Sequence, residues 1–123
     1  MNNAINWFEI PAIDFERAVK FYNRILNLEL RRETLQGRPN GVFTASAEGV
    51  GGAVVQGANY TLSASGIVIY LDTDGKLDEV LSRVEAAGGK IILPKTHIGP
   101  QGDVALLIDT EGNRVGLHQE SGE

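Results

Sequence analysis

The sequence predicts an α+β fold built from two tandem modules, each with the order strand, helix, strand, strand, strand. Short stretches of alternating apolar residues, separated by glycine-rich turns, indicate strands, whereas two longer stretches with helical spacing indicate helices. The same order of elements occurs twice. Phe15 and Leu77 occupy matching positions, as do Tyr22 and Val84, both pairs at an offset of 62. We therefore expect one duplicated unit, with module 1 at residues 4–57, a linker at 58–65 and module 2 at 66–120.

Module 1 is expected to begin with a strand at residues 5–10. In this strand Trp7 and Glu9 share one face, because side chains alternate along an extended chain. Asp14 is a suitable N-cap for the helix that follows, and Asn27 is a suitable end to it. Three further strands complete the module, at residues 28–34, 41–47 and 52–56.

Module 2 repeats this order after a small, polar linker. A strand at residues 67–71 precedes Asp72–Gly75, which is expected to open a helix that Gly88 and Gly89 close. Strands follow at residues 90–97, 104–108 and 114–119, and the last two are joined by a tight turn at Asp109–Asn113. In the closing strand, Val115 and Leu117 form an apolar face, and the other face carries Arg114, Gly116 and His118.

Composition excludes several classes of protein. The 123 residues carry a net charge of −5 and show no basic patch, so we expect no nucleic-acid partner. No apolar run approaches the roughly 20 residues that a membrane span requires. The absence of cysteine excludes disulfides and thiolate metal sites. The N-terminus lacks the features of a secretory signal, so a cytoplasmic location is expected.

Each predicted sheet has one helix to cover it, and therefore one face that remains to be covered. Either the sister module or a second subunit must pack against that face. A duplicated half-sheet thus predicts a concave, partly enclosed space and a homodimer.

Four stretches are similar to sequences of the vicinal-oxygen-chelate superfamily: Trp7–Pro11, Asp14–Tyr22, Glu85–Gly89 and Asp109–Asn113. This superfamily includes glyoxalase I, the bleomycin and fosfomycin resistance proteins and the extradiol dioxygenases. The resemblance spans residues 5–119. It implies the glyoxalase/bleomycin-resistance fold, in which paired βαβββ modules curve into a barrel-like cleft that two subunits often complete together.

The resemblance also implies a divalent metal held by His, Gln or Glu side chains in the cleft. The implied ligand positions fall at Trp7, near Gln56, near Ile67 and at Gly116. Only Gln56 has a suitable side chain, and a single amide does not hold a divalent ion. We therefore expect no metal cofactor and no ordinary glyoxalase I activity.

Glu9 and His118 are the candidate catalytic residues. If the opening strand of one subunit and the closing strand of the other line one cavity, these two side chains could act as an acid/base pair. Two simpler interpretations remain. His118 can sit at a solvated strand end, and Glu9 can form a dimer salt bridge with one of three cations, Arg38, Lys95 or Arg114.

The cleft is expected to bind a small organic molecule. Trp7 could stack on it or pack in the core, and Gly116 leaves space opposite. Lys95 could contact an anionic group at the cleft mouth or simply be solvated. The other expected ligand-binding residues are Phe43, Gln56, Ile67 and Ile69. A zinc or iron set of His97, His118 and Glu9 has the right residue types, but no spacing that places them together.

Two motifs resemble ligand-binding loops, but each lacks a feature that such a loop requires. Gly49–Gly52 looks like a phosphate loop but precedes a strand instead of a helix. Asp72–Gly75 starts like a calcium loop but lacks the later ligands, so we interpret it as a helix cap. The sequence predicts no particular reaction. Two alternatives remain open: a metal-dependent lyase or dioxygenase with displaced ligands, and a non-enzymatic dimeric interaction module.

Overall fold

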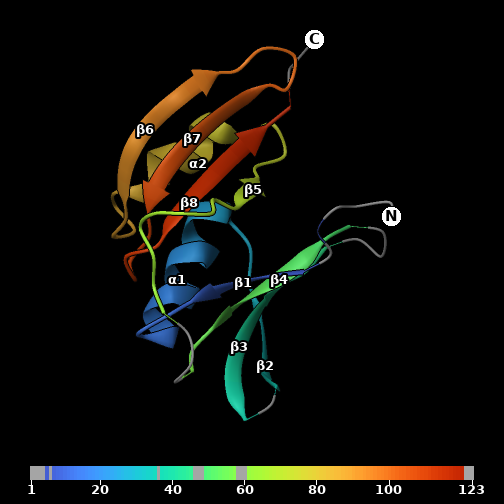
Figure 1. Ribbon diagram of the computed structural model, residues 1–123, viewed down its shortest axis with the longest axis vertical. Helices are drawn as coiled ribbons and strands as arrows, with labels where there is room; N and C mark the ends of the chain where they lie inside the picture. The colour runs from blue at the N-terminus through green and yellow to red at the C-terminus, as the bar shows by residue number, and fades with distance from the viewer. Residues whose placement is uncertain (1–4, 6, 36, 46–48, 58–60, 121–123) are drawn as a thin grey trace.

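The computed structural model describes residues 5, 7–35, 37–45, 49–57 and 61–120. It confirms the α+β prediction of two four-stranded sheets with helices packed on them (Figure 1). The elements are, in order, β1 (Trp7–Pro11), α1 (Phe15–Leu26), β2 (Arg31–Leu35), β3 (Arg38–Phe43), β4 (Gly51–Val55), β5 (Tyr70–Asp72), α2 (Leu77–Val84), β6 (Lys90–His97), β7 (Asp103–Ile108) and β8 (Arg114–Gln119).

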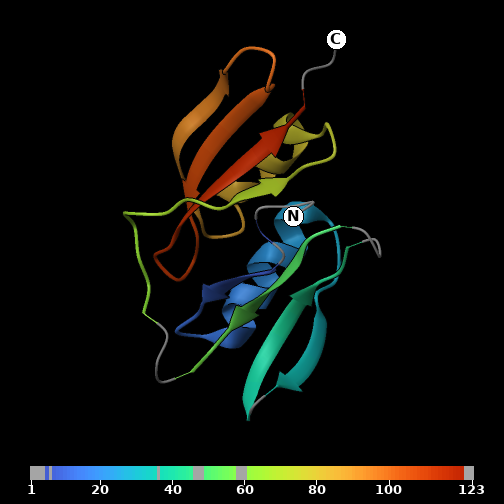
Figure 2. The same ribbon diagram turned by 45° about the vertical axis from the view of Figure 1, so that its right-hand side comes forward.

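The two sheets have the same topology. The first has the strand order β1-β4-β3-β2 and the second β5-β8-β7-β6. In each sheet the opening strand pairs in parallel with the closing strand, and the remaining pairs are antiparallel. Figure 2 shows the sheets in separate halves of the molecule. No helix within the described ranges is long and apolar enough to cross a bilayer.

Helix α1 begins and ends as predicted. The Asp14 side chain accepts a hydrogen bond from the amide of Arg17, and Asn27 takes the left-handed conformation that ends a helix. The side chains of α1 that face inward are fully buried at Val19, Tyr22 and Ile25. Local capping and apolar spacing therefore suffice to define this helix.

The predicted start of the second helix is wrong. Its N-cap is Lys76, which makes no side-chain capping bond, and helix α2 begins at Leu77. In the preceding turn, Oδ1 of Asp72 accepts a hydrogen bond of 2.9 Å from the amide of Asp74. Asp74 and Gly75 both have positive φ angles, which a right-handed helix does not accommodate. The predicted end also differs, because α2 ends at Val84 with Glu85 as its C-cap. A turn follows, in which Gly88 has a φ of 103° and the amide of Gly89 bonds to the carbonyl of Val84.

Several strand boundaries also differ from the prediction. Strand β3 starts at Arg38, three residues before the expected start at residue 41, and Gly37, with a φ of 73°, lies in the turn that precedes it. Strand β2 starts three residues later than expected. Strand β5 covers only residues 70–72, and Ile67 lies outside it, 91% exposed. Residues 46 and 47 of the third expected strand, residue 4 of module 1 and linker residues 58–60 lie outside the described part of the chain.

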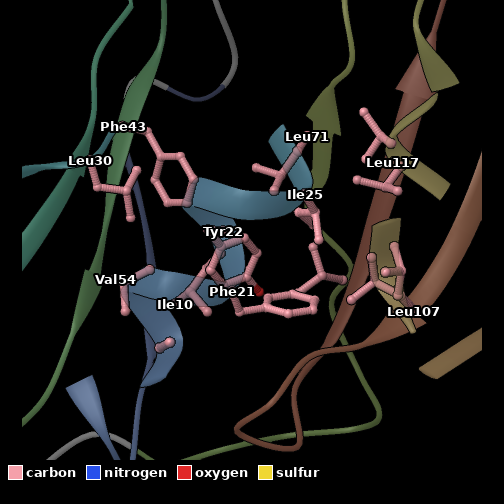
Figure 3. Close-up of a cluster of buried hydrophobic side chains, with 14 of the residues drawn as sticks. Ile10, Phe21, Tyr22, Ile25, Leu30, Phe43, Val54, Leu71, Leu107 and Leu117 are labelled. Carbon is pink, nitrogen blue, oxygen red and sulfur yellow. The ribbon is translucent and has the colours of Figure 1, made fainter. Parts of the chain in front are cut away.

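One hydrophobic core joins the two modules. It combines apolar side chains of both sheets with those of both helices. Figure 3 shows α1 between the sheets, with Ile10 and Val54 approaching from one side and Leu107 and Leu117 from the other. Each sheet turns one face toward this common core and the other face away from it. On the first sheet, the face turned away carries a separate buried cluster of Val42, Ala53 and Val55. The arrangement leaves the outer faces of one chain on different sides of the molecule.

Candidate functional site

A groove of about 970 Å³ opens between the two modules. Module 1 contributes Phe8 and Phe43, whose ring centroids are 5.4 Å apart, together with Leu26 and Leu28 at the end of α1. Module 2 contributes residues 68–72, and Asp74 completes the rim on that side. The groove has the size and mostly apolar lining of a site for a drug-sized molecule.

Local sequence explains how strand β5 forms its wall. Leu71 points into the core, so its neighbours Tyr70 and Asp72 point outward. The ring of Tyr70 lies directly against Gly116, where an added Cβ would be 2.4 Å from Cδ1 of the ring. The space that Gly116 was expected to leave for a ligand is therefore filled by Tyr70, which itself remains 48% exposed.

Of the sequence-predicted ligand-binding residues, Phe43 and Ile69 line this groove. Trp7 and Glu9 are exposed, and they alternate along β1 with Phe8 and Ile10, which pack on the core. Their side chains therefore lie on the outer face of the first sheet.

His118 and Gly116 belong to the corresponding outer face of the second sheet, since Val115 and Leu117, which alternate with them along β8, are core residues. Nε2 of His118 lies 2.7 Å from the carbonyl oxygen of Gln101, so this nitrogen is the donor. Glu9 and His118 are on the outer faces of different sheets. A single chain does not bring them together, and a shared cavity needs a second copy.

The side chain of Gln56 has a structural role that the sequence interpretation missed. Its Oε1 accepts a hydrogen bond of 2.8 Å from the amide of Phe15, the first residue of α1. Module 2 repeats this contact, because Oε1 of Gln119 accepts a bond of 3.0 Å from the amide of Leu77, the first residue of α2. In each module, a glutamine at or just after the end of the last strand caps the helix of that same module. The recurring glutamine was the available signal.

Lys95 and His97 lie on the edge strand β6, outside the groove. Lys95 pairs with Asp78 at 3.2 Å, and Nδ1 of His97 is 2.9 Å from Oδ1 of Asp103. Hydrogen bonds from Gln119 and then from His97 lower the pKa of Asp103. Among the residues that the structure describes, no three His, Asp or Glu side chains are grouped to hold a metal, so His97, His118 and Glu9 form no such set.

The residues at the implied metal positions do not fit a divalent ion. Trp7 offers an indole, Gln56 uses its amide oxygen to cap α1, and Gly116 lies beneath the ring of Tyr70. Ile67 is aliphatic and 91% exposed. These side chains supply none of the carboxylate or imidazole ligands that such a site requires.

A buried polar cluster, made of Tyr22, Asp109, Glu111 and Asn113 with Arg17 at its edge, joins the modules on the other side of the core. The Glu111 carboxylate accepts bonds from the amides of Ile13 and Asp14 and pairs with Arg17 at 2.7 Å. Burial acts to raise the pKa of Glu111, but bonds from Arg17, Asp14 and Thr110 outweigh it and lower that pKa. The sequence indicated a turn at Asp109–Asn113 and a resemblance to the superfamily there, but no contact with module 1. Its acidic residues were the signal that this turn docks on module 1.

Residues 4–117 match the model of the Glyoxalase/Bleomycin resistance protein/Dioxygenase superfamily. No curated protein matches the chain by sequence.

Solved structures share the fold at low sequence identity. A glyoxalase/bleomycin resistance protein from Albidiferax ferrireducens T118 is similar with a TM-score of 0.74 and 16% identity, over 96% of this chain and 99% of that one. TnmS3, an antibiotic binding protein from Streptomyces sp. CB03234, is similar with a TM-score of 0.68 and 21% identity, over 97% of both chains. A glyoxalase I mutant from Zea mays has a TM-score of 0.70 and 19% identity, over 92% of this chain and 45% of that one.

Proposed function

This chain belongs to the Glyoxalase/Bleomycin resistance protein/Dioxygenase superfamily, and from that membership and its groove we propose that it binds a small organic molecule without a metal ion. The observation that carries the proposal is the groove of about 970 Å³ between the modules, lined by Phe8, Phe43 and Ile69. Apolar walls of this extent favour transfer of an apolar molecule from water.

The side chains at the implied metal positions support binding without a metal. Trp7 and Gly116 offer no metal ligand, and the one candidate, Gln56, already accepts a hydrogen bond from the start of α1. The Streptomyces neighbour, which is described as an antibiotic binding protein, is an example of this fold whose stated role is binding. A binding role therefore suits this chain better than metal-assisted chemistry.

We propose further that the protein is a homodimer. The outward faces carry large apolar side chains, with Trp7 44% exposed, Tyr70 48% and Ile92 43%. A second copy packed on these faces would remove that area from water. The dimer is also what would bring Glu9 of one copy toward His118 of another, as an acid/base pair beside a bound molecule needs.

The binding proposal is tested with Nile red, a neutral dye whose fluorescence rises in apolar surroundings. We expect one dye per chain to bind, with the same Kd in the presence and absence of EDTA. Val68 lines the groove and is half-buried. The variant V68W should fill the groove and weaken binding at least about tenfold, since a ligand site loses affinity when its volume is occupied. The matched control S82W places the same ring on the exposed side of α2 and should bind like the original protein.

Three outcomes decide between the proposal and its alternatives. Absence of Nile red binding to the original protein, with a dimer seen by light scattering, would favour the interaction module. Stoichiometric zinc, nickel or iron in protein purified without chelator, measured by plasma mass spectrometry, would favour the metal-dependent lyase or dioxygenase. Equal affinity of V68W and S82W would place the bound dye outside the groove and overturn the proposed site.

A further inference from the structure

The floor and the rim of the groove differ in chemistry. Its floor is apolar and partly aromatic, because Phe8 and Phe43 form one ring pair there, and residues 68–71 line the opposite wall. An aromatic face attracts a positive charge within about 6 Å of the ring centre, because the ring quadrupole is negative there. The floor can therefore hold a flat organic molecule, and it favours one with a positive charge.

The ionisable groups of the rim all have one sign. Asp72 and Asp74 line it, and the lining includes no Lys, Arg or His of the described chain. Both aspartates are exposed. The backbone fixes their positions, since Asp74 has a φ of 53° and its amide donates to Oδ1 of Asp72 at 2.9 Å. Two carboxylates thus stand at the mouth of an apolar groove with no lining cation to offset them.

We infer that the groove selects organic cations, namely apolar or aromatic molecules that carry an ammonium or a comparable positive group, over organic anions. This inference rests on the proposed function and adds the charge class of the ligand. A concave, apolar wall concentrates the field of the carboxylates at its mouth. Because both groups are solvated, each contributes a several-fold effect, and together they give a preference of about tenfold for a cation over a matched anion.

The net charge of −5 favours cations everywhere on the surface, so the experiment has to separate a local effect from a general one. The double variant D72N/D74N removes the two rim charges and keeps the side-chain size and one acceptor oxygen in each side chain. The double variant E79Q/E85Q removes two charges from exposed positions on and just after α2. Both variants change the net charge equally, and only the first changes the groove.

The probes are rhodamine 6G, a cation, and fluorescein, an anion on the same xanthene scaffold, with neutral Nile red as reference. Fluorescence anisotropy should show rhodamine 6G binding at least about tenfold more tightly than fluorescein at low salt, and less of a difference at 1 M salt. D72N/D74N should weaken rhodamine 6G binding about fivefold or more, and it should change the Kd of neutral Nile red several-fold less than that. E79Q/E85Q should change neither Kd by more than about twofold.

Equal Kd values for rhodamine 6G and fluorescein would overturn the inference. Equal effects of the two double variants on the Kd of rhodamine 6G would also overturn it. In either case, Nile red binding that remains sensitive to V68W would leave the proposed function intact. Absence of Nile red binding to the original protein would overturn both the proposed function and the inference about ligand charge. Circular dichroism checks that D72N/D74N is folded. If it is not, D74N alone keeps the hydrogen bond to Oδ1 of Asp72 and should show about half of the effect on a logarithmic scale.

Discussion

The hydroxyl of Tyr22 donates a hydrogen bond of 2.6 Å to Oδ2 of Asp109, and both residues are buried. Tyr22 belongs to α1 of module 1, and Asp109 lies in the turn between β7 and β8 of module 2. Burial, and then the nearby Asp109 carboxylate, raise the pKa of Tyr22 well above its usual value. This bond therefore joins the two modules inside their shared core, where water cannot replace either partner.

Replacing Tyr22 with phenylalanine should destabilise the protein by about 2 kcal/mol, because a buried carboxylate loses a strong hydrogen bond. Y70F makes the same chemical change on a half-exposed ring and should alter stability by less than about 0.5 kcal/mol. Urea unfolding measures both variants. Equal effects would show that the Tyr22 hydroxyl contributes no more inside the core than a hydroxyl at the surface.

Glu111 should make the protein sensitive to acid. Its folded-state pKa is lowered, because the bonds to Arg17, Asp14 and Thr110 outweigh the opposing effect of burial. Its stabilising contribution is therefore complete above the unfolded pKa of about 4.3, and it is lost as pH falls through that value toward the folded pKa. E111Q should lower stability by about 2–3 kcal/mol at pH 7 and flatten its dependence on pH below about 5.

Glu16 supplies the control for this measurement. Its pKa is also lowered, first by a hydrogen bond from Arg32, but the pair is exposed to solvent. E16Q should leave the acid dependence close to that of the original protein, since water screens an exposed pair. Urea titrations between pH 3 and pH 7 would contradict the role of Glu111 if E111Q and E16Q had the same profile.

The two glutamine caps should have parallel effects. Q56A leaves the amide of Phe15 without its acceptor, and Q119A does the same to the amide of Leu77. We expect each change to cost about 1 kcal/mol, the usual value for loss of a helix cap. The cost should be larger for Q119A, because Nε2 of Gln119 also donates to Asp103.

Q101A removes a glutamine side chain from an exposed turn and should be nearly neutral. Thermal unfolding measures all three variants. A neutral Q56A would contradict the capping role and would release Gln56 for another function.

Gly52 and Gly116 each lie against an aromatic ring, and the two rings differ in their freedom to move. A Cβ at Gly52 would lie 2.4 Å from the Phe8 ring, which is paired with Phe43 and packed on the core. A Cβ at Gly116 would lie equally close to the half-exposed Tyr70 ring. G52A should therefore cost about 2–3 kcal/mol, and G116A less than about 1, since only Tyr70 can turn into solvent. Urea unfolding that ranked the two variants in the opposite order would contradict this account.

Local patterns in the sequence determined much of the secondary structure. Helix α1 follows from Asp14, Asn27 and one apolar stripe, and strands β6 and β8 have the predicted bounds. The alternation in β8 also placed Val115 and Leu117 in the core. All of these features depend on neighbouring residues. The start of α2 was wrong because the side chain of Asp72 bonds the following turn, which competes locally with a helix.

What the sequence by itself determined is the α+β class, the duplicated order of elements and which residues of a strand share a face. Only the tertiary structure decided that Phe43 and Ile69 line a groove between the modules while Trp7 and His118 face outward. The physical reason is the range of the contacts. Alternation and capping act over a few residues, whereas the modules are docked by bonds such as that between Ile13 and Glu111, which are 98 positions apart. No local pattern specifies a partner at that separation.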